Sequence, residues 1–182
     1  VKNNKGPGVK NAVMTGVEQC KFEIILITVV DELFPVFSFE KMLNKMVDEN
    51  YDMISGTRYK GDGKKLGGNF VEKLLSFTAN KLLHLILMHP LSDLTTGIKM
   101  IKKLHLLDNI KLECKPVGWA FALELSLKMH LYDYKVSEVP YKTVDRLFGG
   151  KSSFNLIPWV QEYLKWFVWG IYATSKKKLR KF

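Results

Sequence analysis

Short apolar runs alternate along the chain with longer segments whose apolar residues recur at helical spacing. Residues 23–30 (EIILITVV) form a continuous run rich in β-branched residues, which predicts a strand buried on both faces. Residues 52–55 (DMIS) predict a second short strand, and the apolar spacing at 9–20 and 39–47 predicts a helix before each strand. Helix, strand, helix, strand with short connections predicts an α/β domain with a largely parallel sheet.

The remaining elements follow from the same patterns and from glycine and proline positions. Pro90 ends the longest helical pattern, and Pro140 interrupts a late alternating segment. The predicted elements are a flexible loop at 61–68, helices at 69–88, 104–110 and 120–130, and strands at 97–101 and 134–144.

The last helical pattern, residues 157–173, differs from the others. Its apolar residues share one face, polar residues including Lys165 share the other, and Trp and Tyr rings are frequent. A membrane span needs about 20 largely uncharged residues, which this stretch lacks. We predict a helix that lies in a membrane interface, with a basic tail facing anionic headgroups. The alternative is a packed amphipathic helix that covers the sheet or a dimer surface.

Composition adds a bias toward anionic partners. The 182 residues carry a formal net charge of +10, which suits nucleic acid, anionic lipid or a phosphorylated substrate. Cys20 and Cys114 are too few and too far apart for a disulfide framework or a metal site, and we expect reduced thiols in a cytoplasmic setting. The chain does not begin with Met, and its opening loop resembles the middle of a fold, so we expect a fragment without its N-terminal part.

Several charged residues follow predicted strands. Asp31 and Glu32 come directly after the first strand, where open α/β sheets place ligands, and could hold Mg²⁺ or Mn²⁺. Arg58 follows the second strand and could bind a phosphate with two donors. Asp93 precedes the third strand and points at the same edge. The alternatives are a turn-capping Asp31 and a surface salt bridge for Arg58.

Two further positions suggest chemistry. Glu124 lies in an otherwise apolar helix, where a carboxylate needs either a partner in an ion pair or a function. Arg146, Lys151 and Ser152 belong to a basic, glycine-containing loop that suits a diphosphate or a lipid phosphate, although such a loop could equally be a flexible linker.

The order of these short motifs resembles that of a known family. The motifs in sequence order are GPGVKNA (6–12), VD (30–31), SGTR (55–58), AN (79–80), SDLTTG (92–97), GxxFxxE (118–124), EVPY (138–141) and RxxGGKSS (146–153). Together they resemble the family 2 glycosyltransferases of the polyprenyl- or dolichyl-phosphate mannose or glucose synthase type, over nearly the whole chain.

The resemblance implies a GT-A, Rossmann-like, mostly parallel sheet flanked by helices and incomplete at the N-terminus. It divides the chain into a partial catalytic domain at 1–153 and an amphipathic membrane-interface helix with a basic tail at 154–182. The reaction implied is inverting transfer of a sugar from UDP-glucose or GDP-mannose to a polyprenyl phosphate, at the cytoplasmic face of a membrane.

Residue roles follow the matched motifs. Asp31, with Glu32, would hold Mg²⁺ or Mn²⁺, although Val29 replaces the first Asp of the family's Asp-x-Asp motif. Arg58 and Asp93 would be catalytic, with Asp93 acting as a base or as a loop organiser. The residues implied in substrate or phosphate binding are Gly6, Gly8, Arg58, Ser76, Asn80, Glu124, Arg146, Lys151 and Ser152.

Other functions fit part of the pattern. The same fold could use a saccharide or other hydroxyl acceptor, in which case a base such as Asp93 becomes necessary. Val29 and the absent N-terminal unit also fit a degenerate, non-catalytic membrane-associated module. Nucleic-acid binding rests on charge alone, and no recognisable motif supports it.

Overall fold

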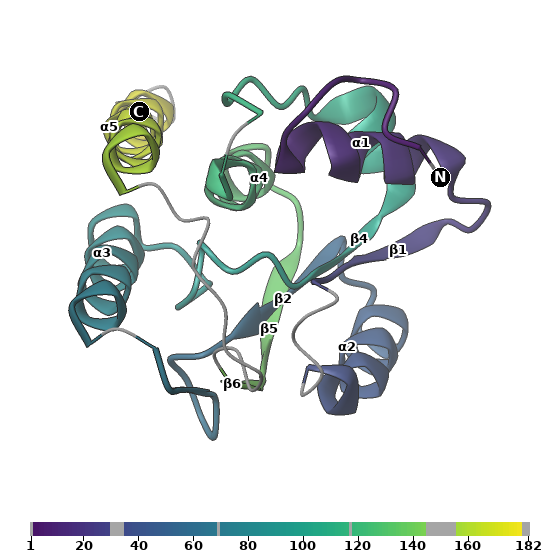
Figure 1. Cartoon of the computed structure of the whole chain (residues 1–182), viewed down its shortest axis with the longest axis horizontal. Coiled ribbons are helices and arrows are strands. Elements are labelled where there is room, and N and C mark those ends of the chain that lie inside the picture. The colour runs from purple at the N-terminus through teal and green to yellow at the C-terminus, as the bar shows by residue number, and fades with distance from the viewer. Residues whose placement is uncertain (1, 30–34, 69, 117, 145–155, 180–182) are drawn as a thin grey trace.

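The computed structural model describes residues 2–29, 35–68, 70–116, 118–144 and 156–179 (Figure 1). A mixed sheet lies at its centre with helices on both faces, as the α/β prediction requires. The helices are α1 (Val9–Gln19), α2 (Val36–Asp48), α3 (Phe70–Leu87), the π-helix η1 (His105–Asn109), α4 (Ala120–Leu131) and α5 (Leu156–Leu179). The strands are β1 (Ile24–Ile27), β2 (Met53–Thr57), β3 (Lys64–Leu66), β4 (Lys99–Lys102), β5 (Val136–Pro140) and β6 (Lys142–Val144).

The central sheet has the strand order β1-β4-β2-β5. Strands β1, β2 and β5 run in one direction, as predicted, but β4 runs the opposite way between β1 and β2. Only the β2–β5 pair of this sheet is therefore parallel, although three of its four strands share one direction. The reversal brings the start of β4 to the edge where β2 ends, so the loops around both points meet there.

A second, two-stranded sheet lies beside this edge. Residues 64–66 in the predicted flexible loop form β3, which pairs in parallel with β6. The predicted strand at 134–144 is divided in two after Pro140, which ends the outer strand β5 where its missing N–H is tolerated. Tyr141 joins the two sheets, since its N–H donates to Thr57 O at 3.0 Å and its carbonyl accepts from Lys64 N at 3.1 Å.

The two faces of the central sheet have separate cores. Met42 and Met46 of α2 pack against one face with Ile54 of β2. Helix α4 covers the other face, with ten consecutive residues buried from Ala120 to Met129, and α1, α3 and α5 surround it. Apolar residues lie on every side of α4, between a few polar ones such as Glu124, so the helix needs such cover.

Helix α5 packs against both α3 and α4. Its Trp166 is 2% exposed, and Tyr163, Phe167 and Trp169 also pack on the main core. One face of α5, which carries Trp166, is therefore packed against the core, as the alternative prediction of a packed amphipathic helix requires. Within the described residues, no helix is both long and apolar enough to cross a membrane.

Candidate functional site

Arg58 and Asp93 meet where β2 ends and the loop before β4 begins. The Arg58 Nε donates to Asp93 Oδ2 at 2.7 Å, its Nη2 donates to Oδ1 at 2.9 Å, and its backbone N–H donates to Oδ2 at 3.2 Å. Nη2 also donates to Thr95 Oγ1 at 3.2 Å. The sequence placed both residues at this edge, and the structure joins them in a two-pronged ion pair, the strong geometry for arginine and carboxylate.

Burial of this pair disfavours the charged form of each side chain. The Asp93 side chain is 0% exposed and that of Arg58 is 14% exposed. Burial by itself would raise the pKa of Asp93, but the charge and hydrogen bonds of Arg58 outweigh burial and lower that pKa. Asp93 opposes the effect of burial on Arg58 in the same way and raises its pKa. Both groups are therefore ionised at neutral pH, and Asp93 is better suited to organising its loop than to accepting a proton.

Helix α3 holds the loop that carries Asp93. Asn80 Oδ1 accepts from the Leu94 N–H at 2.7 Å, and Asn80 Nδ2 donates to Thr95 Oγ1 at 2.8 Å. Ser76, one turn earlier, accepts the Tyr59 hydroxyl at 2.8 Å. Ser76 and Asn80 therefore belong to the same site as Arg58 and Asp93, while direct contact with a substrate stays a prediction for them.

The sequence did not identify Glu138, which supports the loop from β5. Its Oε2 accepts from the Ser92 N–H at 2.7 Å and from the Ser92 hydroxyl at 3.0 Å. Its Oε1 is buried without a hydrogen bond of good geometry among the described residues, although Lys60 Nζ lies 3.3 Å away. Glu138 belongs to the EVPY motif (138–141), but its alternation with apolar residues does not indicate that it is buried.

Glu124 forms the structural ion pair that was the alternative to a functional role. It is fully buried, its two oxygens accept from the backbone N–H groups of Glu113 and Cys114 at 2.7 and 2.8 Å, and Lys128 Nζ lies 2.7 Å away. The carboxylate thus holds the segment before α4 in place. A substrate-binding role for Glu124 stays a prediction that this geometry does not favour.

The two glycines of the opening motif have conformational roles. Gly6 and Gly8 both have positive φ, at 84° and 114°. A Cβ on Gly8 would lie 2.1 Å from the Pro116 carbonyl oxygen, so only glycine fits there. Within the described part of the chain, neither glycine contacts Arg58 or Asp93, and their phosphate-binding role stays a prediction.

Five predicted site residues fall outside the described ranges: Asp31, Glu32, Arg146, Lys151 and Ser152. Among the residues that the structure does describe, no group of three or more His, Cys, Asp or Glu side chains could hold a metal ion. The predicted Mg²⁺ or Mn²⁺ site therefore depends on Asp31 and Glu32 and stays a prediction.

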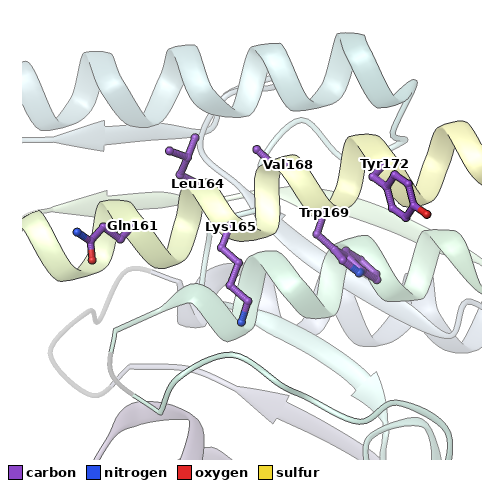
Figure 2. Close-up of a pocket in the computed structure, with 6 residues that line it drawn as sticks. All are labelled: Gln161, Leu164, Lys165, Val168, Trp169 and Tyr172. Atoms are coloured by element: carbon purple, nitrogen blue, oxygen red, sulfur yellow. The ribbon is translucent and has the colours of Figure 1, made fainter.

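A large apolar surface lies on α3 and α5. The outward residues of α3 that are 43% to 72% exposed are Phe70, Val71, Leu74, Leu75, Phe77, Leu82, Leu85 and Ile86. The exposed stripe of α5 consists of Val160, Leu164, Val168 and Tyr172. Several of these α5 residues line a hollow of about 560 Å³, shown in Figure 2, in which Leu164 and Val168 point to one side of the helix and Lys165 to the other. Exposed apolar surface of this extent is typical of a binding face.

No protein-family model matches the chain. Solved structures of glucosyl-3-phosphoglycerate synthase from Mycobacterium tuberculosis do resemble it. The complex with UDP gives a TM-score of 0.62 at 13% identity, covering 92% of this chain and 56% of the synthase. The complex with Mg²⁺ and UDP gives 0.63 at 14% identity, covering 91% and 55%. The complex with Mn²⁺, UDP-glucose and phosphoglyceric acid gives 0.63 at 13% identity, covering 92% and 56%.

These likenesses show that the chain has the GT-A glycosyltransferase fold, as the motif order predicted. The chain spans a little over half the length of the synthase chains that it matches.

Proposed function

We propose that the protein is a glycosyltransferase that moves a sugar from a nucleotide-sugar to a polyprenyl phosphate, with inversion at the anomeric carbon. The observation that carries the proposal is the buried Arg58–Asp93 pair at the sheet edge of a GT-A fold. Open α/β sheets bind ligands beyond the carboxyl ends of their strands, which is where this pair lies. The synthase with the same fold binds UDP and UDP-glucose, which supports a nucleotide-sugar donor here.

Arg58 is the cation at this edge that is best positioned to receive a phosphate. Its Nε and Nη2 are occupied by Asp93 and Thr95, so Nη1 is without a partner among the described residues. An ionised phosphate acceptor needs little deprotonation, so the ion-paired Asp93 is not required as a base. Its role is to fix the plane of the Arg58 guanidinium, which orients the reacting groups.

We further propose that Asp31 and Glu32 hold Mg²⁺ or Mn²⁺. They follow β1, which ends at the same edge as β2, and carboxylate oxygens suit both cations. The synthase was solved with each of these ions, which supports the choice. A bound divalent cation would neutralise negative charge on the departing nucleoside diphosphate.

A lipid acceptor is supported by the apolar surface of α3 and α5, which we propose faces the headgroup region at the cytoplasmic side of a membrane. Among the described side chains of these two helices, the only carboxylate is Glu162, which is buried and accepts a hydrogen bond from Trp166 Nε1. Lys81 of α3 is exposed and positively charged, whereas Lys165 of α5 points away from Leu164 and Val168. An anionic bilayer complements the charge of Lys81, whereas a two-fold dimer through the same face would bring two copies of it together.

Transfer is tested with the full-length protein, radiolabelled UDP-glucose or GDP-mannose, polyprenyl phosphate and Mg²⁺ or Mn²⁺. We expect label in the organic phase, and a loss of at least about tenfold in Arg58→Lys, which keeps the charge but not the two-pronged geometry. Lys41→Met, on the exposed side of α2, is the matched control and should keep full activity. Label that stays in water with every lipid acceptor would refute the polyprenyl phosphate.

Membrane binding is tested by sedimentation with phosphatidylcholine vesicles, with and without 30% phosphatidylglycerol (about one anionic lipid in three). We expect Leu74→Gln/Leu85→Gln to reduce binding. The control Phe37→Gln/Val47→Gln removes two apolar side chains of α2 that are also more than half exposed, on the opposite face of the sheet, and should bind normally. Point substitutions are preferable to removing α5, because that deletion would uncover the core around Trp166. Equal binding by both double variants would contradict the proposed surface.

A hydroxyl acceptor is the second candidate. The synthase with the same fold was solved with UDP-glucose and phosphoglyceric acid together, which favours a small soluble acceptor in this architecture. Labelled phosphoglycerate or saccharide in the aqueous phase, with no organic-phase product, would support this candidate.

A further inference from the structure

Lys99 is the first residue of β4 and is 0% exposed, which is unusual for a lysine. Its Nζ donates to Ser126 Oγ on α4 at 2.8 Å and to Ser55 Oγ on β2 at 3.1 Å. Both hydroxyls direct their own hydrogens to backbone carbonyls, of Gly56 for Ser55 and of Leu94 or Ala122 for Ser126. Among the described residues, the ammonium is therefore held by neutral oxygens and no carboxylate is in direct contact with it.

The register places Lys99 in a polar row directly beneath the site. Ser55 is opposite Lys99 across the β2–β4 pair and opposite Glu138 across the β2–β5 pair, so the three side chains share the face toward α4. Ser126 connects Lys99 to the loop above, because its hydroxyl lies 3.1 Å from the Leu94 carbonyl. The residues on either side of Leu94, Asp93 and Thr95, both accept hydrogen bonds from Arg58.

The charges that face Lys99 come from each neighbouring element. Asp93 in the loop and Glu138 on β5 favour its protonation, whereas Arg58 after β2 opposes it. His89, beyond α3, stays neutral because burial lowers its pKa to about 3. Burial dominates for Lys99 and lowers its pKa to about 7. The Lys99 ammonium thus adds a buried positive charge beneath the loop, beside Arg58, and its charge changes near neutral pH.

We propose that Lys99 is a positioning residue for sugar transfer, whose ammonium holds the loop of Asp93 from below and keeps Arg58 oriented toward the substrate phosphate. The inference rests on the proposed function, since it assigns a role within that site. A purely structural role makes a different prediction, because loss of activity would then follow loss of stability and would not depend on the charge of Lys99.

The test measures kcat/KM for transfer between pH 6 and 9 in the full-length wild type, Lys99→Met and Lys99→Arg, with the melting temperature of each. Below the melting temperature of each variant, we expect Lys99→Met to lose on the order of 10- to 100-fold in kcat/KM at pH 6.5. Wild-type kcat/KM should fall as the pH rises through about 7. Lys99→Arg, which stays charged, should not show that fall. The acceptor phosphate also titrates near pH 6, so the difference between variants is the decisive quantity.

Two outcomes overturn the inference: Lys99→Met within about twofold of wild type at pH 6.5, or the same decline above pH 7 in wild type and Lys99→Met. If Lys99→Arg does not fold, the comparison of wild type with Lys99→Met decides alone. Transfer by wild type that is unaffected by Lys99→Met refutes this inference only. Absence of transfer by wild type refutes the proposed function, and the positioning role with it.

Discussion

Replacing Asp93 by Asn isolates the contribution of the buried ion pair to stability. The substitution keeps the shape but puts an NH₂ group where an oxygen now accepts from Arg58. Breaking a buried pair typically costs about 3–5 kcal/mol. Because the Arg58 side chain is 14% exposed and can be partly hydrated, we expect a loss near the lower end, about 3 kcal/mol in the free energy of unfolding. For a chain of this size, that loss corresponds to roughly 6–12 °C in melting temperature.

The assay is urea unfolding followed by tryptophan fluorescence at pH 7 and at several lower pH values. The folded-state pKa of Asp93 lies below its unfolded value of about 3.9. Ionised Asp93 therefore contributes its full stabilisation when the pH is above the unfolded-state pKa. This contribution is lost as the pH falls through the folded-state pKa. The difference between wild type and Asp93→Asn should accordingly be largest at neutral pH and shrink in acid.

The matched control is Asp62→Asn, which removes the same charge from an exposed pair with Lys142 at 4.0 Å. That variant should unfold within about 0.5 kcal/mol of wild type. The reasoning is refuted if Asp93→Asn is as stable as Asp62→Asn at pH 7, or if its deficit grows as the pH falls.

Three further predictions test the packing around the site. Gly97→Ala should destabilise the protein by about 1–3 kcal/mol, because the new Cβ would lie 2.4 Å from a ring carbon of Trp119, and an unchanged urea midpoint would contradict this. Glu124→Gln should cost about 3 kcal/mol, since it removes the charge from a fully buried ion pair, and a shift below about 1 kcal/mol in the same assay would argue against it. One thiol, that of exposed Cys20, should react with iodoacetamide at pH 8 in the native protein, because Cys114 is buried and its pKa is raised to about 12. Two thiols that react equally fast before urea is added would show that Cys114 is accessible.

Hydrophobic patterning predicted most elements of this fold, because each apolar run or helical stripe reports local burial. It could not give the direction of β4, since a strand has the same period whichever way it runs. It also missed β3, whose three residues, Lys-Lys-Leu, lack an apolar run and lie among glycines. Strand pairing of this kind depends on a partner far along the chain, here β6, and not on the local sequence.

The candidate site was predictable in part. Arg58 and Asp93 were placed at one edge because each adjoins a predicted strand, but their bonding to each other depends on β4 running in reverse. Lys99 and Glu138 were not identified, because charged residues within strands are normally expected at the surface. Burial of both follows only from the position of α4 and the loop above them.

The position of β4 between β1 and β2 has a consequence for folding during synthesis. Neither β1 nor β2 pairs with the other, and both bond to a strand that emerges from the ribosome after α3 is complete. Until then, two apolar strands have open edges, the state in which chains add to one another instead of folding. The parallel partner β5 arrives later still, so the sheet forms through contacts between distant residues, which are slow to form. We therefore expect nascent chains that stop before residue 102 to be the most dependent on chaperones.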